Sequence, residues 1–177
     1  MKNDRMKPVH PGTRIGHVHL KVADLDRAIA FYHGVLGFTV TQRMGNRAAF
    51  LAAGGYHHHI GLNTWESFGG PAPAPGTTGL YHLAILYPTR AELADALHRL
   101  IQAGIPLEGA ADHGVSNALY LRDPDENGVE LYWDLPPEQW PRTAEGELAM
   151  ITRSLDLHAL LRERDVPETS VGPRDLA

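Results

Sequence analysis

Polar and apolar residues alternate in a short segment near the start of the chain. Apolar residues that are spaced as on one face of a helix follow this segment. Residues 17–22, HVHLKV, alternate strictly, which predicts a half-buried β-strand. After Asp24, and again after Thr89, apolar residues recur every three or four positions, which predicts two amphipathic helices. Asp and Thr are favoured N-cap residues, and Gly37 and Gly104 follow the two helices where left-handed C-caps are common.

The strand and helix belong to a unit that occurs twice. A histidine lies seven residues before each predicted N-cap, since His17 precedes Asp24 and His82 precedes Thr89 at the same spacing. Three apolar runs separated by turn residues follow each helix and predict further strands. These strands are expected over 38–44, 47–53 and 57–64 in the first copy, and over 105–110, 118–123 and 129–133 in the second. Each copy therefore predicts a β-α-β-β-β module.

The order of elements predicts an α+β fold built from two tandem βαβββ modules. A helix is also expected over 154–164, and residues 166–177 are expected to lack regular structure. The expected boundaries are an N-terminal arm over 1–14, a first module over 15–66, a Pro/Gly linker over 67–77, a second module over 78–134 and a C-terminal tail over 135–177.

Composition narrows the class of protein. The chain has 177 residues, of which 43% are hydrophobic and 21% charged, as in ordinary globular proteins. A formal net charge of −5 without a long basic run argues against a nucleic-acid partner. No apolar run approaches the roughly 20 residues that span a membrane, and residues 1–12 lack the apolar stretch of a secretory signal. Cysteine is absent, which excludes disulfides and thiolate sites, and a cytoplasmic protein is expected.

Eleven histidines are many for this length, and several occupy positions that suggest chemistry. His17 and His19 share the polar face of the first strand. Glu130 lies in the apolar run VELYW, where either an exposed strand face or a metal site would explain a carboxylate. The triplet 57–59 falls within a predicted strand, so that His57 and His59 are expected on one face and His58 on the other. A polar strand face is the simpler interpretation of this triplet.

The repeated module and the segments GHVHLKVADLDRAIAFYHGVLGF, YHLAI and DPDENGVELYW resemble the vicinal oxygen chelate superfamily. That superfamily includes glyoxalase I, fosfomycin-resistance enzymes, antibiotic-sequestering proteins and extradiol dioxygenases. The segments GGYHHHIGLNTW and DHGVSNALYLRDPDENGVELYWD are most similar to catechol 2,3-dioxygenase-like proteins. The resemblance implies a partly closed mixed β-barrel, with flanking helices, around a divalent metal.

By position, the resemblance implies that His17, His82 and Glu130 are the metal ligands. Two imidazoles and one carboxylate form the facial triad of non-haem Fe(II) oxygenases, and this set leaves coordination positions open for substrate. Fe(II) is therefore the expected cofactor, with Mn(II) as the alternative. His19 shares the strand face with His17, but only His17 matches the spacing of His82 from the following helix cap.

The resemblance also implies three catalytic residues that do not bind metal. His58 corresponds to the acid–base histidine of extradiol dioxygenases, a role that suits imidazole because its pKa lies near neutrality. Tyr120 and His113 correspond to residues that contact the substrate oxygens. The simpler alternatives are a half-buried strand tyrosine for Tyr120 and a loop histidine for His113.

The expected function is metal-dependent extradiol cleavage of a catecholic aromatic diol by O2. A glyoxalase-like lyase is one alternative, although Ile60 lies near the place of its additional carboxylate ligand. A fosfomycin-type thiol transferase would require a basic phosphonate pocket, for which no Lys/Arg cluster is evident. A non-catalytic small-molecule binding protein would generally lack the three ligands. The resemblance and the additional C-terminal helix are compatible with a homodimer.

Overall fold

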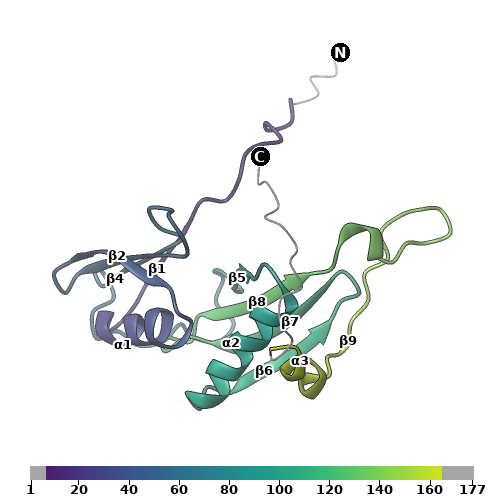
Figure 1. The fold of residues 1–177 in the computed structure, drawn as a ribbon. Helices are drawn as coiled ribbons and strands as arrows, with labels where there is room; N and C mark the ends of the chain where they lie inside the picture. The colour runs from purple at the N-terminus through teal and green to yellow at the C-terminus, as the bar shows by residue number, and fades with distance from the viewer. Residues whose placement is uncertain (1–6, 165–177) are drawn as a thin grey trace.

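The computed structural model describes residues 7–164 (Figure 1). The first module begins with strand β1 (Val18–Lys21) and helix α1 (Leu25–Ile29), which continues as a π-helical segment (Ala30–Val35). Strands β2 (Thr39–Met44), β3 (Ala48–Ala52) and β4 (Ile60–Asn63) complete it.

The second module has the same order of elements. It consists of β5 (Leu83–Leu86), α2 (Arg90–Gln102), β6 (Leu107–Asp112), β7 (Ser116–Arg122) and β8 (Gly128–Asp134). A 3-10 turn (Pro137–Gln139), the short strand β9 (Arg153–Ser154) and helix α3 (Leu157–Glu163) follow.

The strands form two mixed sheets with matching topology. The first has the order β1-β4-β3-β2 and the second β5-β8-β7-β6-β9. The β1–β4 and β5–β8 pairs are parallel and the other pairs are antiparallel. The predicted pair of βαβββ modules is therefore confirmed. The two sheets are not closed into a barrel, and their arrangement is compatible with the partly closed one that was expected.

The local signals that begin and end the helices act as predicted. The Asp24 side chain accepts a hydrogen bond from the backbone N–H of Arg27, and Thr89 accepts one from Glu92. Each satisfies a helix N–H that has no partner within the helix. Gly37 and Gly104 adopt φ values of 86° and 67°, which glycine tolerates without steric strain.

Two expectations about element boundaries were wrong. The histidine triplet 57–59 lies in a turn before β4, so alternation along a strand does not decide which way its side chains point. The turn is held to the neighbouring strands because Thr41 Oγ1 donates to the carbonyl of His57, and His59 N–H donates to that of Leu51. The C-terminal helix is also shorter than expected, because residues 153–154 pair with β6 as strand β9. The expectation for 166–177 lies outside the described residues.

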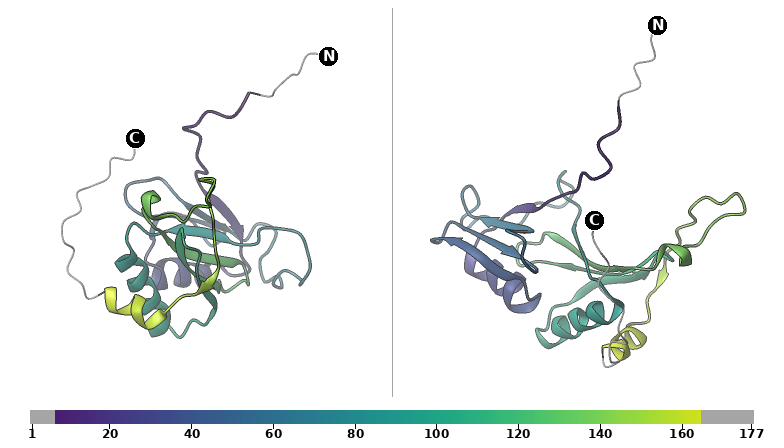
Figure 2. Two further views of the ribbon diagram at one scale, coloured as in Figure 1. Left: turned by 90° about the vertical axis from the view of Figure 1, so that its right-hand side faces the viewer. Right: turned by 45° about the horizontal axis from the view of Figure 1, so that its top comes forward.

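The helices cover one side of the sheets. Figures 1 and 2 show the two modules side by side, with α1 under the first sheet and α2 and α3 under the second. One cluster of buried apolar side chains spans both modules and includes Phe31, Leu62, Leu97 and Leu131. No helix within residues 7–164 has the length and apolar character needed to cross a membrane.

Polar contacts join the modules where helix α1 meets the turn between β7 and β8. The buried Tyr32 hydroxyl donates to Asp123 Oδ2 at 2.9 Å, and Arg27 Nη2 donates to Asp125 Oδ1 at 2.7 Å. Asp125 Oδ1 also accepts the backbone N–H of Ala23. Burial and the adjacent Asp123 raise the pKa of Tyr32, so its hydroxyl stays protonated and donates to the carboxylate.

We expect the substitution Tyr32→Phe to lower the free energy of unfolding by about 2 kcal/mol, because it removes a buried hydrogen bond to a charged group. Denaturant unfolding would measure the change. Tyr56→Phe is the control, since Tyr56 is exposed, and should change stability by less than about 0.5 kcal/mol. Equal effects of the two substitutions would show that the contact with Asp123 contributes little.

Candidate metal centre

The second sheet brings a histidine and a carboxylate together. His82 immediately precedes β5, and Glu130 lies on the parallel neighbour β8, opposite Ala84. His82 Nε2 lies 2.9 Å from Glu130 Oε2, and 32% and 14% of the two side chains are exposed. An imidazole nitrogen and a carboxylate oxygen at the same accessible place fit the donor set that Fe(II) and Mn(II) prefer.

Gly128 permits this close approach of β5 and β8. A Cβ atom at Gly128 would lie 2.1 Å from the carbonyl oxygen of Tyr81 and 3.0 Å from the Cβ of His82. The backbone on either side would have to move, so only glycine fits at this position of β8. The sequence analysis did not identify this role, and the signal that could have indicated it is a glycine at the start of a strand, which often marks a close backbone approach.

We expect Gly128→Ala to weaken metal binding at least tenfold, because it displaces His82 from Glu130. It should also lower the free energy of unfolding by about 1–3 kcal/mol. Titration of the protein with Fe(II) and denaturant unfolding would measure the two effects. Gly109→Ala on β6 is the matched control, since a Cβ there meets only the Tyr120 ring at 3.9 Å. Unchanged metal affinity in Gly128→Ala would contradict this account of His82.

Tyr120 and His113 extend the cluster away from Glu130. Tyr120 lies opposite Glu130 in the β7–β8 pair, and its hydroxyl donates to Glu130 Oε1 at 3.0 Å. His113 Nε2 lies 2.8 Å from the same hydroxyl, so this nitrogen acts as the donor to the hydroxyl oxygen. On its other side, His113 Nδ1 lies 3.1 Å from Thr152 Oγ1, which helps to fix the ring. Burial, together with the hydrogen bond to Glu130, raises the pKa of Tyr120 to about 12.

The first module brings together a second group of rings. His17 immediately precedes β1, and its ring centroid lies 4.5 Å from that of His58. His58 also contacts Phe50 of β3, with centroids 5.0 Å apart. Its Nδ1 lies 2.7 Å from Nδ1 of His57, so one imidazole donates to the other. Desolvation, followed by the neighbouring histidines His17 and His57, lowers the pKa of His58, which favours its neutral form.

Other histidine rings of this region pack against Tyr56 and Trp65. His59 and His57 both contact the ring of Tyr56, at centroid distances of 4.7 Å and 4.1 Å. His19 packs over Gly61 and beside Trp65, with a centroid distance of 5.5 Å to the indole. Burial, followed by the charge of His17, lowers the pKa of His19.

The structure thus places the six candidate residues in two groups. One group belongs to the second module and consists of His82, Glu130, Tyr120 and His113. The other group belongs to the first module and consists of His17 and His58. Within residues 7–164, no three histidine or carboxylate side chains are positioned to hold one metal ion. His17 and His82 nevertheless line one hollow of about 710 Å³ between the modules.

Sequence reasoning missed several residues that shape these groups. Thr152 contacts His113 from a segment 39 residues away, and no local pattern indicates this contact. Phe50 was treated only as part of an apolar strand, although its ring lies against both His58 and His19.

Comparison with known proteins identifies the family. The model of the Glyoxalase/Bleomycin resistance protein/Dioxygenase superfamily matches residues 14–131, which is most of the chain. The chain belongs to this superfamily. Solved structures that resemble the chain include a lactoylglutathione lyase from Agrobacterium tumefaciens, which is 26% identical with a TM-score of 0.55. The match covers 70% of this chain and 96% of the lyase chain. A domain from Frankia sp. EAN1pec, also 26% identical, has a TM-score of 0.58 and covers 70% of this chain and 98% of its own.

Two curated proteins similar to this chain are dioxygenases by name. Catechol-2,3-dioxygenase of Bacillus subtilis (strain 168) is 43% identical over 170 residues, which are 96% of this chain and 59% of the relative. Biphenyl-2,3-diol 1,2-dioxygenase 3 of Rhodococcus globerulus is 36% identical over 121 residues, which are 68% of this chain and 63% of the relative. The chain therefore spans about three fifths of the length of these relatives.

Proposed function

We propose that this chain is an extradiol-type dioxygenase that opens the ring of a catecholic diol with O2. The series of contacts that runs from His82 through Glu130 and Tyr120 to His113 carries the proposal. It combines an imidazole and a carboxylate that can bind a metal with side chains that can donate and accept protons. The two dioxygenases among the relatives support the choice of reaction. Both oxygen atoms of O2 would enter the product as the ring C–C bond beside the diol breaks, and no external reductant is consumed.

In this proposal His17, His82 and Glu130 hold Fe(II), or Mn(II) as the alternative. The metal would supply open coordination positions at which the two diol oxygens and O2 are held side by side. A single carboxylate leaves the site with net positive charge, which favours the anionic form of the diol.

The residues that do not bind metal would orient the diol and move its protons. His58 would accept a proton from a diol hydroxyl and later return one, because its lowered pKa favours the neutral form that can accept. Tyr120 would remain protonated near neutral pH. Its single O–H, which donates to Glu130 in the substrate-free structure, would donate to a substrate oxygen instead when the diol is bound. His113 would hold the Tyr120 hydroxyl from its other side.

Aerobic addition of catechol to the Fe(II)-loaded chain tests the proposal. We expect a yellow ring-opened product whose formation requires both the metal and O2. The same assay with biphenyl-2,3-diol compares the two diols named for the relatives. Absence of ring cleavage for both diols by fully iron-loaded protein would refute the proposed function.

We further propose that the active form is a homodimer in which each metal site combines the first module of one copy with the second module of the other. Two observations support this arrangement. The helices lie on one side of both sheets, which leaves the other side of each sheet without a covering helix (Figure 2). The described residues of one chain gather no three metal donors. A two-fold axis would form two equivalent sites from two copies.

Mixing two inactive variants tests the shared site. His17→Ala alters the first module and Glu130→Ala the second, so each homodimer would have two defective sites. If the modules pair between copies, a mixed dimer has one site with all its ligands. After random reassociation, we expect the mixture to regain about a quarter of the wild-type activity. A mixture that reassociates and stays inactive would show that each site is formed within one chain.

A further inference from the structure

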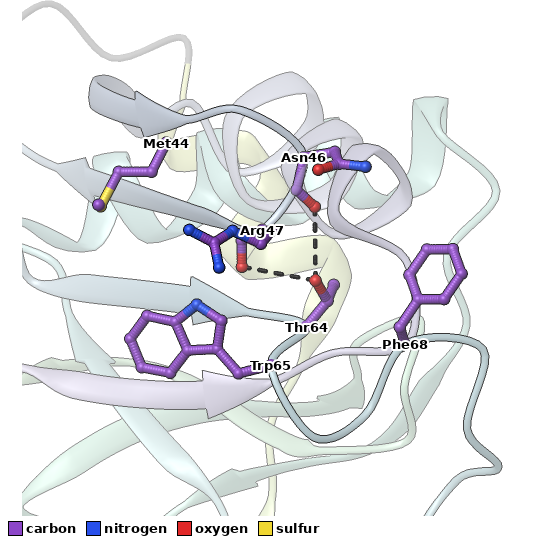
Figure 3. Close-up of a pocket in the computed structure, with 6 residues that line it drawn as sticks. All are labelled: Met44, Asn46, Arg47, Thr64, Trp65 and Phe68. Atoms are coloured by element: carbon purple, nitrogen blue, oxygen red, sulfur yellow. Dashed lines mark hydrogen bonds between the residues drawn. The ribbon is translucent and has the colours of Figure 1, made fainter.

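A second hollow, of about 650 Å³, lies beside the hairpin that joins β2 and β3 (Figure 3). We call it the Arg47–Trp65 pocket, and its lining residues are Met44, Asn46, Arg47, Thr64, Trp65 and Phe68. Three of its apolar side chains are unusually exposed, at 48% for Met44, 59% for Trp65 and 78% for Phe68. A planar apolar group could therefore gain contact area here.

Backbone contacts give the pocket a defined shape. Buried Thr64, immediately after β4, donates its backbone N–H to the carbonyl of Arg47 at 3.0 Å. Its hydroxyl lies 3.4 Å from the carbonyl oxygen of Asn46, which holds the hairpin turn against the segment that carries Trp65 (Figure 3). The Arg47 and Trp65 side chains extend to the same side of this junction (Figure 3).

Arg47 brings a positive charge to the pocket, and the lining contains no acidic residue. Within the described part of the chain, its guanidinium forms no ion pair. Arg43 of the same hairpin, by contrast, pairs with Asp26 at 2.7 Å. A guanidinium next to an exposed indole suits a planar ligand that bears a carboxylate, which it can bind with two parallel hydrogen bonds.

A continuous series of rings connects this pocket with the candidate acid–base histidine. The centroids of His58 and Phe50 are 5.0 Å apart, those of Phe50 and His19 are 6.0 Å apart, and those of His19 and Trp65 are 5.5 Å apart. These separations are typical of interacting aromatic rings. A ligand with more than one ring could lie along this series, with one end at His58 and the other at Trp65.

We infer that the Arg47–Trp65 pocket recognises the acidic end of the substrate, and that the preferred substrate is a catechol extended by a second ring that bears a carboxylate. The inference rests on the proposed function, which places the diol near His58. The second ring lies along Phe50 and His19, and the carboxylate binds Arg47. Arg47 and Trp65 thereby select among catechols, and the ring-opening chemistry takes place at the other end of the series.

The test compares biphenyl-2,3-diol with its analogue that carries a carboxylate on the distal ring. Anaerobic calorimetric titration of the iron-loaded chain measures binding without turnover, and aerobic assays then measure ring cleavage. We expect the acid to bind about fivefold more tightly than the neutral diol, as suits a partly exposed ion pair. Arg47→Gln should remove this preference, whereas Arg43→Gln, whose side chain pairs outside the pocket, should retain it.

The two measurements separate the two proposals. Ring cleavage without a preference for the acid, or a preference that survives in Arg47→Gln, would overturn the inference and leave the proposed function intact. A preference that depends on Arg47, combined with no cleavage of either diol, would overturn the proposed function and the assignment of the acid as its substrate, and would support only the binding of the acid by Arg47. Trp65→Leu should weaken the binding of both diols, and unchanged binding of both would contradict the role of the indole.

Discussion

Replacing His82 or Glu130 with alanine is expected to reduce Fe(II) affinity about 100-fold or more while the chain remains folded. Each change removes one of the donors that lie 2.9 Å apart on the second sheet. Removal of a residue that only hydrogen-bonds to a metal ligand weakens metal binding about 10- to 100-fold. Removal of the ligand itself should weaken metal binding by about 100-fold or more. Metal content after anaerobic loading, measured together with circular dichroism, would test the expectation.

Two control variants match these changes in chemistry and location. Asp134→Ala removes another carboxylate of β8, and His98→Ala removes a histidine from helix α2. Both are expected to retain the wild-type metal content, because neither residue belongs to the proposed ligand set. Full metal retention in both His82→Ala and Glu130→Ala would show that the metal is bound elsewhere.

The second large effect is expected for His58→Ala, which should bind metal normally and cleave catechol about 100-fold more slowly. The His58 ring lies 4.5 Å from that of His17, close enough to act on a diol bound to a metal that His17 would hold. Its lowered pKa favours the neutral imidazole that can accept the diol proton. Initial rates of yellow product formation, divided by the bound iron, would isolate this step from metal binding.

The neighbouring histidines provide the comparison. His57→Ala is expected to have a smaller effect than His58→Ala, because His57 contacts His58 through Nδ1 and orients its ring. His59→Ala should change the rate least, since the His59 ring lies against Tyr56. If His57→Ala caused the largest loss, the acid–base role would belong to His57 instead.

Most elements of the fold could be predicted because their signals are local. The caps at Asp24 and Thr89 each satisfy a helix N–H three residues away, and the glycines at 37 and 104 adopt the expected positive φ. Apolar periodicity then located both helices and most strands to within a few residues. The equal spacing of His17 and His82 from these caps indicated the repeat before any contact was known.

The histidine triplet shows where this kind of reasoning failed. A strand was expected through residues 57–64, but the ladder of β4 begins only at Ile60. A hydrogen bond from Thr41 of β2 and one from His59 to Leu51 of β3 hold the preceding turn in place, and the Thr41–His57 pair is 16 residues apart in sequence. The conformation of this turn therefore places the His58 side chain next to His17. The alternation of side chains along a strand does not explain which way the His58 side chain points.

The sequence by itself determined the two βαβββ modules, their helix caps and the residue types available for chemistry, because these depend on interactions between residues a few positions apart. The tertiary structure alone decided that the Tyr120 hydroxyl hydrogen-bonds to Glu130 and that Thr152 contacts His113. It also decided that the rings of Phe50 and His19 lie between those of His58 and Trp65. Such contacts depend on strand register and on the course of the loops. Both result from packing across the whole core, which a pattern along one segment does not encode.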